Sequence, residues 1–166
     1  VAIGANTTNN NLGRVSVYEL DGNENWVQLG SHIDGEIGSD YHANNWGHSV
    51  SLSSDGQAVA VGGFLGWKMT GRHPDQVRIY QFNGVDQWVQ FGDDIDGGSR
   101  SIGFGYSVSL SSDGKTVAIG APQDTNKGTV SVYSIDIDPP NAPSIPDLDA
   151  SSDTGTSNSD NLTSDT

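Results

Sequence analysis

The sequence contains no cysteine among its 166 residues. This absence excludes thiol catalysis, thiolate-bound zinc and disulfide cross-links, so the fold must be held by its packing. Long apolar runs are also missing, which excludes a transmembrane helix, since such a helix needs about 20 consecutive apolar residues. The chain begins with VAIGA and not with Met, so we expect it to be a processed or excised piece of a longer protein.

Basic residues are scarce: 7 Lys and Arg stand against 21 Asp and Glu, for a formal net charge of −14. Such a field repels phosphate backbones, so nucleic acid is not an expected partner. From Ser134 onward there are seven acids and neither Lys nor Arg, and four of the six prolines lie there too. This composition predicts a disordered acidic tail rich in Ser, Thr, Asp and Pro at 137–166, after a folded domain at 1–136.

Four segments recur in the same order along the folded part. VAIGA at 1–5 returns at 59–63 as VAVGG and at 117–121 as VAIGA, with an offset of 58 each time. The other recurring segments are the turn Asp55-Gly56 (again at Asp113-Gly114), GRVSVYEL at 13–20 (again at 75–82 and 128–135), and WVQLGSHIDGE at 26–36 (again at 88–98). Self-similarity at a fixed period is the signature of a repeat architecture.

Each repeat contains four short segments with the alternation typical of β-strands. In the central copy they lie at 49–53, 59–63, 77–82 and 88–92. Val59 and Val61 point one way and Ala60 the other, which suits a strand covered on both faces. We expect the Asp-Gly pairs to form type I′ hairpin turns, which need positive φ at both central residues.

A unit of four antiparallel strands matches one blade of a β-propeller. The fold class is therefore predicted as all-β, with about two and a half blades of a partial β-propeller. Propellers have at least about four blades, so the rest of the ring would belong to the parent chain. A homo-oligomer that completes the ring is the alternative.

Two motif segments resemble a known family. Phe104-Gly105 followed by Gly120-Ala121-Pro122 resembles the FG-GAP repeat of integrin α-subunit-like propellers, and Trp46-Gly47 is a looser copy of its first half. The resemblance spans roughly residues 1–135 and implies an extracellular or cell-surface propeller used for adhesion or recognition. Many family repeats carry a calcium loop of alternating Asp and Asn. Here the corresponding loops have one carboxylate each, at Asp55 and Asp113, so those calcium sites are not expected.

The loops fall into two classes. Antiparallel order puts the nearly constant turns at one rim and the connections of variable length at the other, and binding residues favour variable loops on a rigid scaffold. The ligand-binding candidates on this variable rim are Tyr41, His42, Trp67, Lys68, Arg72, His73 and Arg100. Trp67 among cations suits an acidic or sulfated glycan or a protein carboxylate. The alternative is that Trp67 covers its loop and that Trp46 replaces the motif Phe in the core.

Other candidates have a structural and a functional interpretation. Asp94 and Asp96 lie in a predicted acidic turn, like that at 33–36, and could contribute to a calcium site, although turn formation by Asp and Gly is the simpler alternative. Trp26 and Trp88 recur at one repeat position, which favours packing between blades. Asn6 and Asn161 begin glycosylation sequons.

No catalytic motif is found in the sequence. The leading hypothesis is a non-catalytic extracellular module for recognition, adhesion or structural repetition, which binds a protein or glycan through the variable rim. The alternative is a scaffold portion of a surface hydrolase or lyase whose catalytic residues lie outside this fragment. No cofactor is expected, calcium apart.

Overall fold

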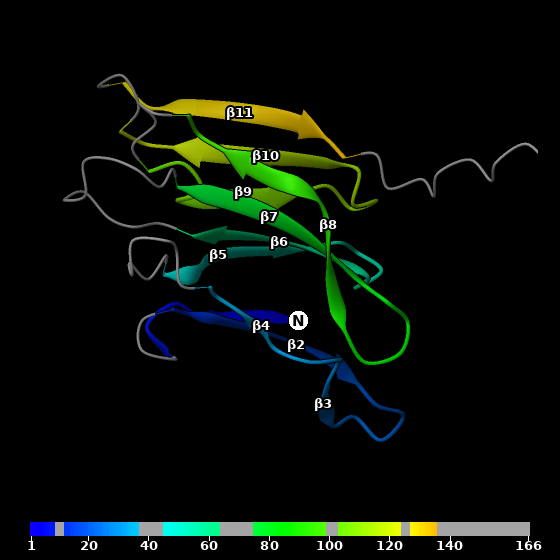
Figure 1. Ribbon diagram of the computed structural model, residues 1–166. Coiled ribbons are helices and arrows are strands. Elements are labelled where there is room, and N and C mark those ends of the chain that lie inside the picture. Colours follow the sequence, from blue (N-terminus) through cyan, green and yellow to red (C-terminus); the bar gives the residue numbers. More distant parts are fainter. Residues whose placement is uncertain (9–11, 37–44, 64–74, 99–102, 124–126, 136–166) are drawn as a thin grey trace, which may run out of the picture.

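The computed structural model describes residues 1–8, 12–36, 45–63, 75–98, 103–123 and 127–135 (Figure 1). The elements formed by these residues are β-strands in three antiparallel sheets. The first sheet contains β1 (Ala2–Ala5), β2 (Arg14–Leu20), β3 (Trp26–Gln28) and β4 (Ile33–Asp34). The second contains β5 (Trp46–Leu52), β6 (Ala58–Gly63), β7 (Gln76–Phe82) and β8 (Trp88–Asp96). The third contains β9 (Ser107–Leu110), β10 (Thr116–Ala121) and β11 (Thr129–Ser134).

The all-β prediction is confirmed, and the strands fall into the three sheets that the repeats predict. The expectation that 33–36 and 93–97 are acidic turns is wrong in part, because Ile33–Asp34 forms the separate short strand β4 and β8 extends through Asp96. Asp34 pairs with Arg14 of β2, and Asp96 pairs with Gln76 of β7. The sequence pattern missed the extension of β8 because the pairing register with β7 shifts between Val77 and Ile79, which interrupts the alternation of β8. The predicted tail at 137–166 lies outside the described residues.

The second sheet packs against the other two, one on each face (Figure 1). All six residues of its strand β6 are buried. Val59 and Val61 belong to the core shared with the first sheet, whereas Ala58 and Ala60 belong to the core shared with the third. The prediction that this strand is covered on both faces is confirmed.

Glycines let neighbouring sheets approach closely along their backbones. Gly47 and Gly105 have φ of +81° and +78°, a region that disfavours side chains. A Cβ added to Gly4 would overlap the carbonyl oxygen of Gly47, and one added to Gly62 would overlap that of Gly105. The repeated glycines of the sequence pattern therefore meet in pairs, each pair joining two sheets.

The Asp-Gly turns differ from the expected type I′. Of the Asp55-Gly56 pair only Gly56 has positive φ, at +72°, whereas type I′ needs it at both residues. Its N–H donates to the carbonyl of Ser53 (3.1 Å), and the Asp55 carboxylate accepts from the Ser53 hydroxyl (2.6 Å) and the Gln57 N–H (3.0 Å). The turn at 111–115 repeats these bonds. Because Asp55 supplies its own acceptor, this residue holds the turn without the left-handed conformation.

Candidate functional site

The predicted variable rim lies where β1, β4, β6, β8 and β10 end, at the left in Figure 1. Antiparallel pairing within every sheet places these strand ends together, opposite the Asp-Gly turns. The ligand-binding candidates Tyr41, His42, Trp67, Lys68, Arg72, His73 and Arg100 lie outside the described residues, so their role stays a prediction. The described residues at this end therefore define the support beneath those connections.

Arg78 of β7 is the centre of the most extensive charged cluster at this support. Its Nε donates to Oδ1 of Asp94 (2.7 Å), and its Nη2 donates to Oδ2 of the same carboxylate (3.0 Å). Glu36, which follows β4, lies 3.3 Å from Nη1. The Arg78 side chain is only 13% exposed, whereas that of Glu36 is 75% exposed. Two carboxylates, one on β8 and one in the segment after β4, thus share one largely covered guanidinium.

The same guanidinium lies over the ring of Trp46, which in turn packs against Tyr80. Its Cζ lies 5.2 Å from the ring centroid of Trp46, and the ring of Tyr80 meets Trp46 edge-on at 6.2 Å. Trp46 is buried, in agreement with the alternative in which it replaces the motif Phe in the core. Its indole Nε1 has no hydrogen-bond partner among the described residues. This geometry favours a cation–π contact in a partly dry environment.

Arg78 and Asp94 hold their charges at neutral pH. Burial is the largest single effect on the pKa of Asp94 and works to raise it, but the hydrogen bonds from Arg78 and Gln90 and the charge of Arg78 together outweigh burial, so the pKa is lowered. Burial is likewise the largest single effect on the pKa of Arg78 and works to lower it, but the hydrogen bonds and charge interactions with Asp94 and Tyr80 together outweigh burial, so the pKa is raised. For Tyr80, burial raises the pKa. Arg78 is therefore a paired structural cation, and its charge is already matched within the protein.

The predicted calcium ligands lie on β8. Both Asp94 oxygens accept from Arg78, and Oδ1 also accepts from the Gln90 amide (2.8 Å). Calcium needs about six to eight oxygen ligands. In the part of the chain that the structure describes, no group of three His, Asp or Glu converges to hold a metal ion. A calcium site that includes Asp94 and Asp96 stays a prediction.

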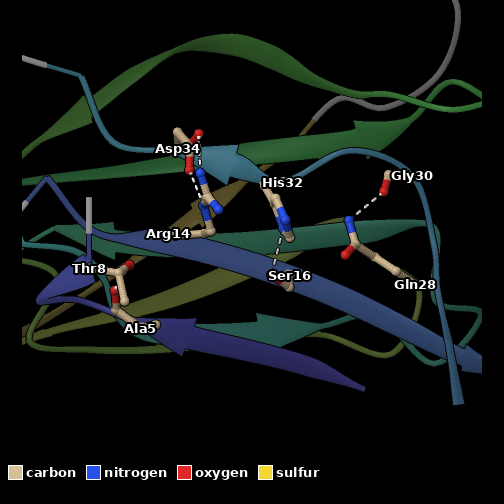
Figure 2. Close-up of polar contacts among 8 residues, drawn as sticks. All are labelled: Ala5, Thr8, Arg14, Ser16, Gln28, Gly30, His32 and Asp34. Atoms are coloured by element: carbon tan, nitrogen blue, oxygen red, sulfur yellow. Dashed lines mark hydrogen bonds and ion pairs between the residues drawn. The ribbon is translucent and has the colours of Figure 1, made fainter.

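Equivalent positions in the first sheet carry a different polar pair (Figure 2). Ser16 and His32, which correspond to Arg78 and Asp94 in the repeat, bond through Oγ and Nδ1 at 2.8 Å. Two residues away on each strand, Nη2 of Arg14 donates to Oδ2 of Asp34 at 2.9 Å, and both side chains are partly exposed. The repeat alignment could have found these pairs, because it places each β2 or β7 residue opposite its partner on the following strand.

The two repeated tryptophans lie in different surroundings. Trp88 is 8% exposed, and its Nε1 donates to the Leu29 carbonyl of the first sheet (2.9 Å). Trp26 is 57% exposed. Trp88 therefore packs between two sheets, whereas Trp26 is largely exposed to solvent.

The remaining motif residues support the sheets. Phe104 and Ala121 are 3% and 1% exposed, and Phe104 meets Tyr133 edge-on at 6.4 Å. Gly120 ends β10 with Ala121, and the exposed Pro122 follows the strand. In the second Asp-Gly turn, Gly114 has φ of +73°, like its copy.

The Asn6 sequon follows β1 at the same end. Asn6 Nδ2 lies 3.4 Å from Nδ1 of His48 on β5, whose ring packs against Tyr106 at 5.0 Å. The second sequon, at Asn161, lies outside the described residues. Glycosylation at both positions stays a prediction.

A groove of about 240 Å³ opens at the opposite end, between the first and second sheets. Its lining combines Leu20, Trp26 and Leu52 with the polar turn residues Asp55 and Gln57. The Ser53 hydroxyl and the Gln57 N–H lower the pKa of Asp55, so its carboxylate is charged at neutral pH. The sequence predicted only structural turns at the end with the Asp-Gly pairs and did not predict the groove. The repeat pattern does not show where two neighbouring sheets leave a space between them.

No family model matches the chain, and no curated protein matches it either. Within the described ranges, no helix is long and apolar enough to cross a membrane.

Proposed function

We propose that this chain is a non-catalytic recognition or adhesion module, built as part of an FG-GAP-like β-propeller and placed outside the cell or at its surface. The observation that carries the proposal is the threefold recurrence of one sheet whose variable connections leave at a single end. The sheets share equivalent strands and pack through equivalent faces. A rigid scaffold that presents variable loops on one rim is a common design for binding proteins.

The charged cluster under this rim supports a scaffold role. Arg78 joins β7, β8 and the segment after β4 through Asp94 and Glu36. Its stacking on Trp46 adds the beginning of β5. Four chain segments next to the variable connections are thereby fixed relative to one another, which reduces the ordering entropy that binding must overcome.

The ligand we propose is an acidic or sulfated glycan, or a protein carboxylate, bound by the connection that contains Trp67, Lys68 and Arg72. Guanidinium and ammonium groups pair with carboxylate and sulfate, and an indole adds an apolar surface for a sugar ring or side chain. This local excess of cations is unusual in a chain with 7 basic and 21 acidic residues.

Glycan and protein arrays probed with the whole chain test this function. We expect binding to acidic members of either array, and at least about a tenfold loss in the variants Trp67→Ala and Arg72→Ala. Val85→Ala is the matched control, since Val85 is 80% exposed on a turn at the opposite end. Absence of any binding, or equal binding by all three variants, would reject the proposal.

A further inference from the structure

The outward faces of the first and third sheets carry the residues that form the cores between sheets. Val1 and Ile3 on the first sheet are 54% and 52% exposed. Their repeat equivalents in the second sheet, Val59 and Val61, are both fully buried. Side chains of one type and one repeat position therefore differ only in whether a neighbouring sheet covers them.

The third sheet shows the complementary face. Val130 and Val132 of β11 are 73% and 66% exposed. Their equivalents on β7, Val77 and Ile79, are 0% and 2% exposed. β11 pairs with β10 along its whole length without a register shift, so it is not displaced from its sheet. Val130 and Val132 are exposed because no further sheet of the described residues covers this face.

The protein itself shows which two faces fit together. In one core, Val15 and Val17 of β2 pack with Val59 and Val61 of β6. In the other core, the β7 pair packs with Val117 and Ile119 of β10. The rule is the same in both cores. The apolar face of the third strand of one repeat (β2 or β7) covers the apolar face of the second strand of the following repeat (β6 or β10). The exposed face of β11 belongs to the third strand of its repeat, and the exposed face of β1 belongs to the second strand of its repeat, so the two faces are of the types that pack together.

We propose that a second copy of this chain docks head to tail, so that Val130 and Val132 of one copy cover Val1 and Ile3 of the next. Such an interface is heterologous, because different surfaces of the two copies meet, and it can extend into rings or filaments. Burial of this apolar surface provides the driving force. This proposal rests on the packing of the repeats and is independent of what the variable rim binds.

Charge and size set the conditions for the test. A net charge of −14 on each copy opposes association at low salt, and about 0.5 M salt screens most of that repulsion. Sedimentation velocity of the whole chain at 0.15 M and 0.5 M salt should show a mass that rises with concentration above 17.4 kDa, more strongly at the higher salt. A chain that stays monomeric up to about 1 mM, near the weak limit of specific association, would overturn the proposal.

Two variants block one face each. Val132→Lys removes the third-sheet face and Ile3→Lys removes the first-sheet face, and each variant alone should associate at least about tenfold more weakly. Mixed in equal amounts they should form a one-to-one complex, because each supplies the face that the other lacks. Val85→Lys, on an exposed turn away from both faces, should associate like the unaltered chain.

The pattern of outcomes separates this docking from other associations. Failure of the mixture to restore a complex, or association by either single variant at the unaltered strength, would contradict the head-to-tail contact. Circular dichroism checks that the variants are folded. If a lysine variant unfolds, Val132→Thr and Ile3→Thr replace it, since threonine keeps the β-branched shape while it makes the face polar.

Discussion

The second sheet and the outward faces of its neighbours are built from the same repeated residues, yet they contribute differently to the fold. Val77 in the second sheet is fully buried, whereas its equivalent Val130 in the third is 73% exposed. Trp88 and Trp26 differ in the same way, at 8% and 57% exposed. The comparison shows that a repeat pattern determines which face of a strand is apolar, and that only the neighbouring sheet determines whether that face stabilises the protein.

The largest effect is expected from truncation at one repeat position in both surroundings. Val77→Ala removes two buried methyl groups and leaves a cavity, so the free energy of unfolding should fall by about 2–3 kcal/mol. Val130→Ala removes the same atoms from a surface and should change that free energy by less than about 0.5 kcal/mol. Chemical denaturation of both variants, at concentrations where the chain is monomeric, measures the difference. Equal losses would show that burial between sheets does not govern stability here.

The next effect concerns the glycines at which two sheets touch. Gly62→Ala drives a methyl group into the Gly105 carbonyl oxygen and should destabilise the fold by about 2 kcal/mol, as overpacking does. At the equivalent Gly120 the nearest atom is the hydroxyl of Ser107, an exposed side chain that can rotate away. Gly120→Ala should therefore cost much less. Thermal unfolding of the two variants ranks them, and the reverse order would contradict the close approach of the second and third sheets.

A smaller effect separates the two Arg–Asp pairs. Arg78→Met leaves Asp94 without its main donor in a partly covered site, and we expect a loss of about 1–2 kcal/mol after allowance for solvent screening. Arg14→Met breaks an ion pair near the surface and should not change the stability measurably. The free energies of unfolding of the two variants test this contrast. If they match, the Arg78 cluster is not a support for the variable rim.

The pH dependence of the Arg78 pair has a definite sign. The pKa of Asp94 is lowered in the folded protein, because the hydrogen bonds from Arg78 and Gln90 and the charge of Arg78 together outweigh the effect of burial. Its contribution to stability is therefore present above the unfolded pKa of about 4 and is lost as pH falls through the folded pKa. Asp94→Asn should flatten this part of the acid unfolding curve, whereas Asp34→Asn serves as the surface control. Identical acid curves for both variants would exclude Asp94 as a source of acid sensitivity.

Much of the fold could be predicted, because the repeats and the alternation of residues such as Val59, Ala60 and Val61 depend on local sequence. The extension of β8 to Asp96 could not, since it follows a register shift that the pattern does not encode. The Arg78 cluster also escaped prediction. Its contacts with Trp46 and Glu36 join different strands and sheets, and only the packed structure brings them together. The turn chemistry was wrong because Asp55 closes its turn through a side-chain acceptor.

The most direct test of the comparison is amide hydrogen exchange, followed strand by strand on the dilute, monomeric chain. The free energy of local opening follows burial and packing. We predict the slowest exchange for the amides of β6, whose residues are all buried, and faster exchange for the paired amides of β1 and β11, whose outward apolar side chains face solvent. Exchange from β1 and β11 as slow as from β6 would contradict the claim that the neighbouring sheet, and not the repeat sequence, determines the stability of each face.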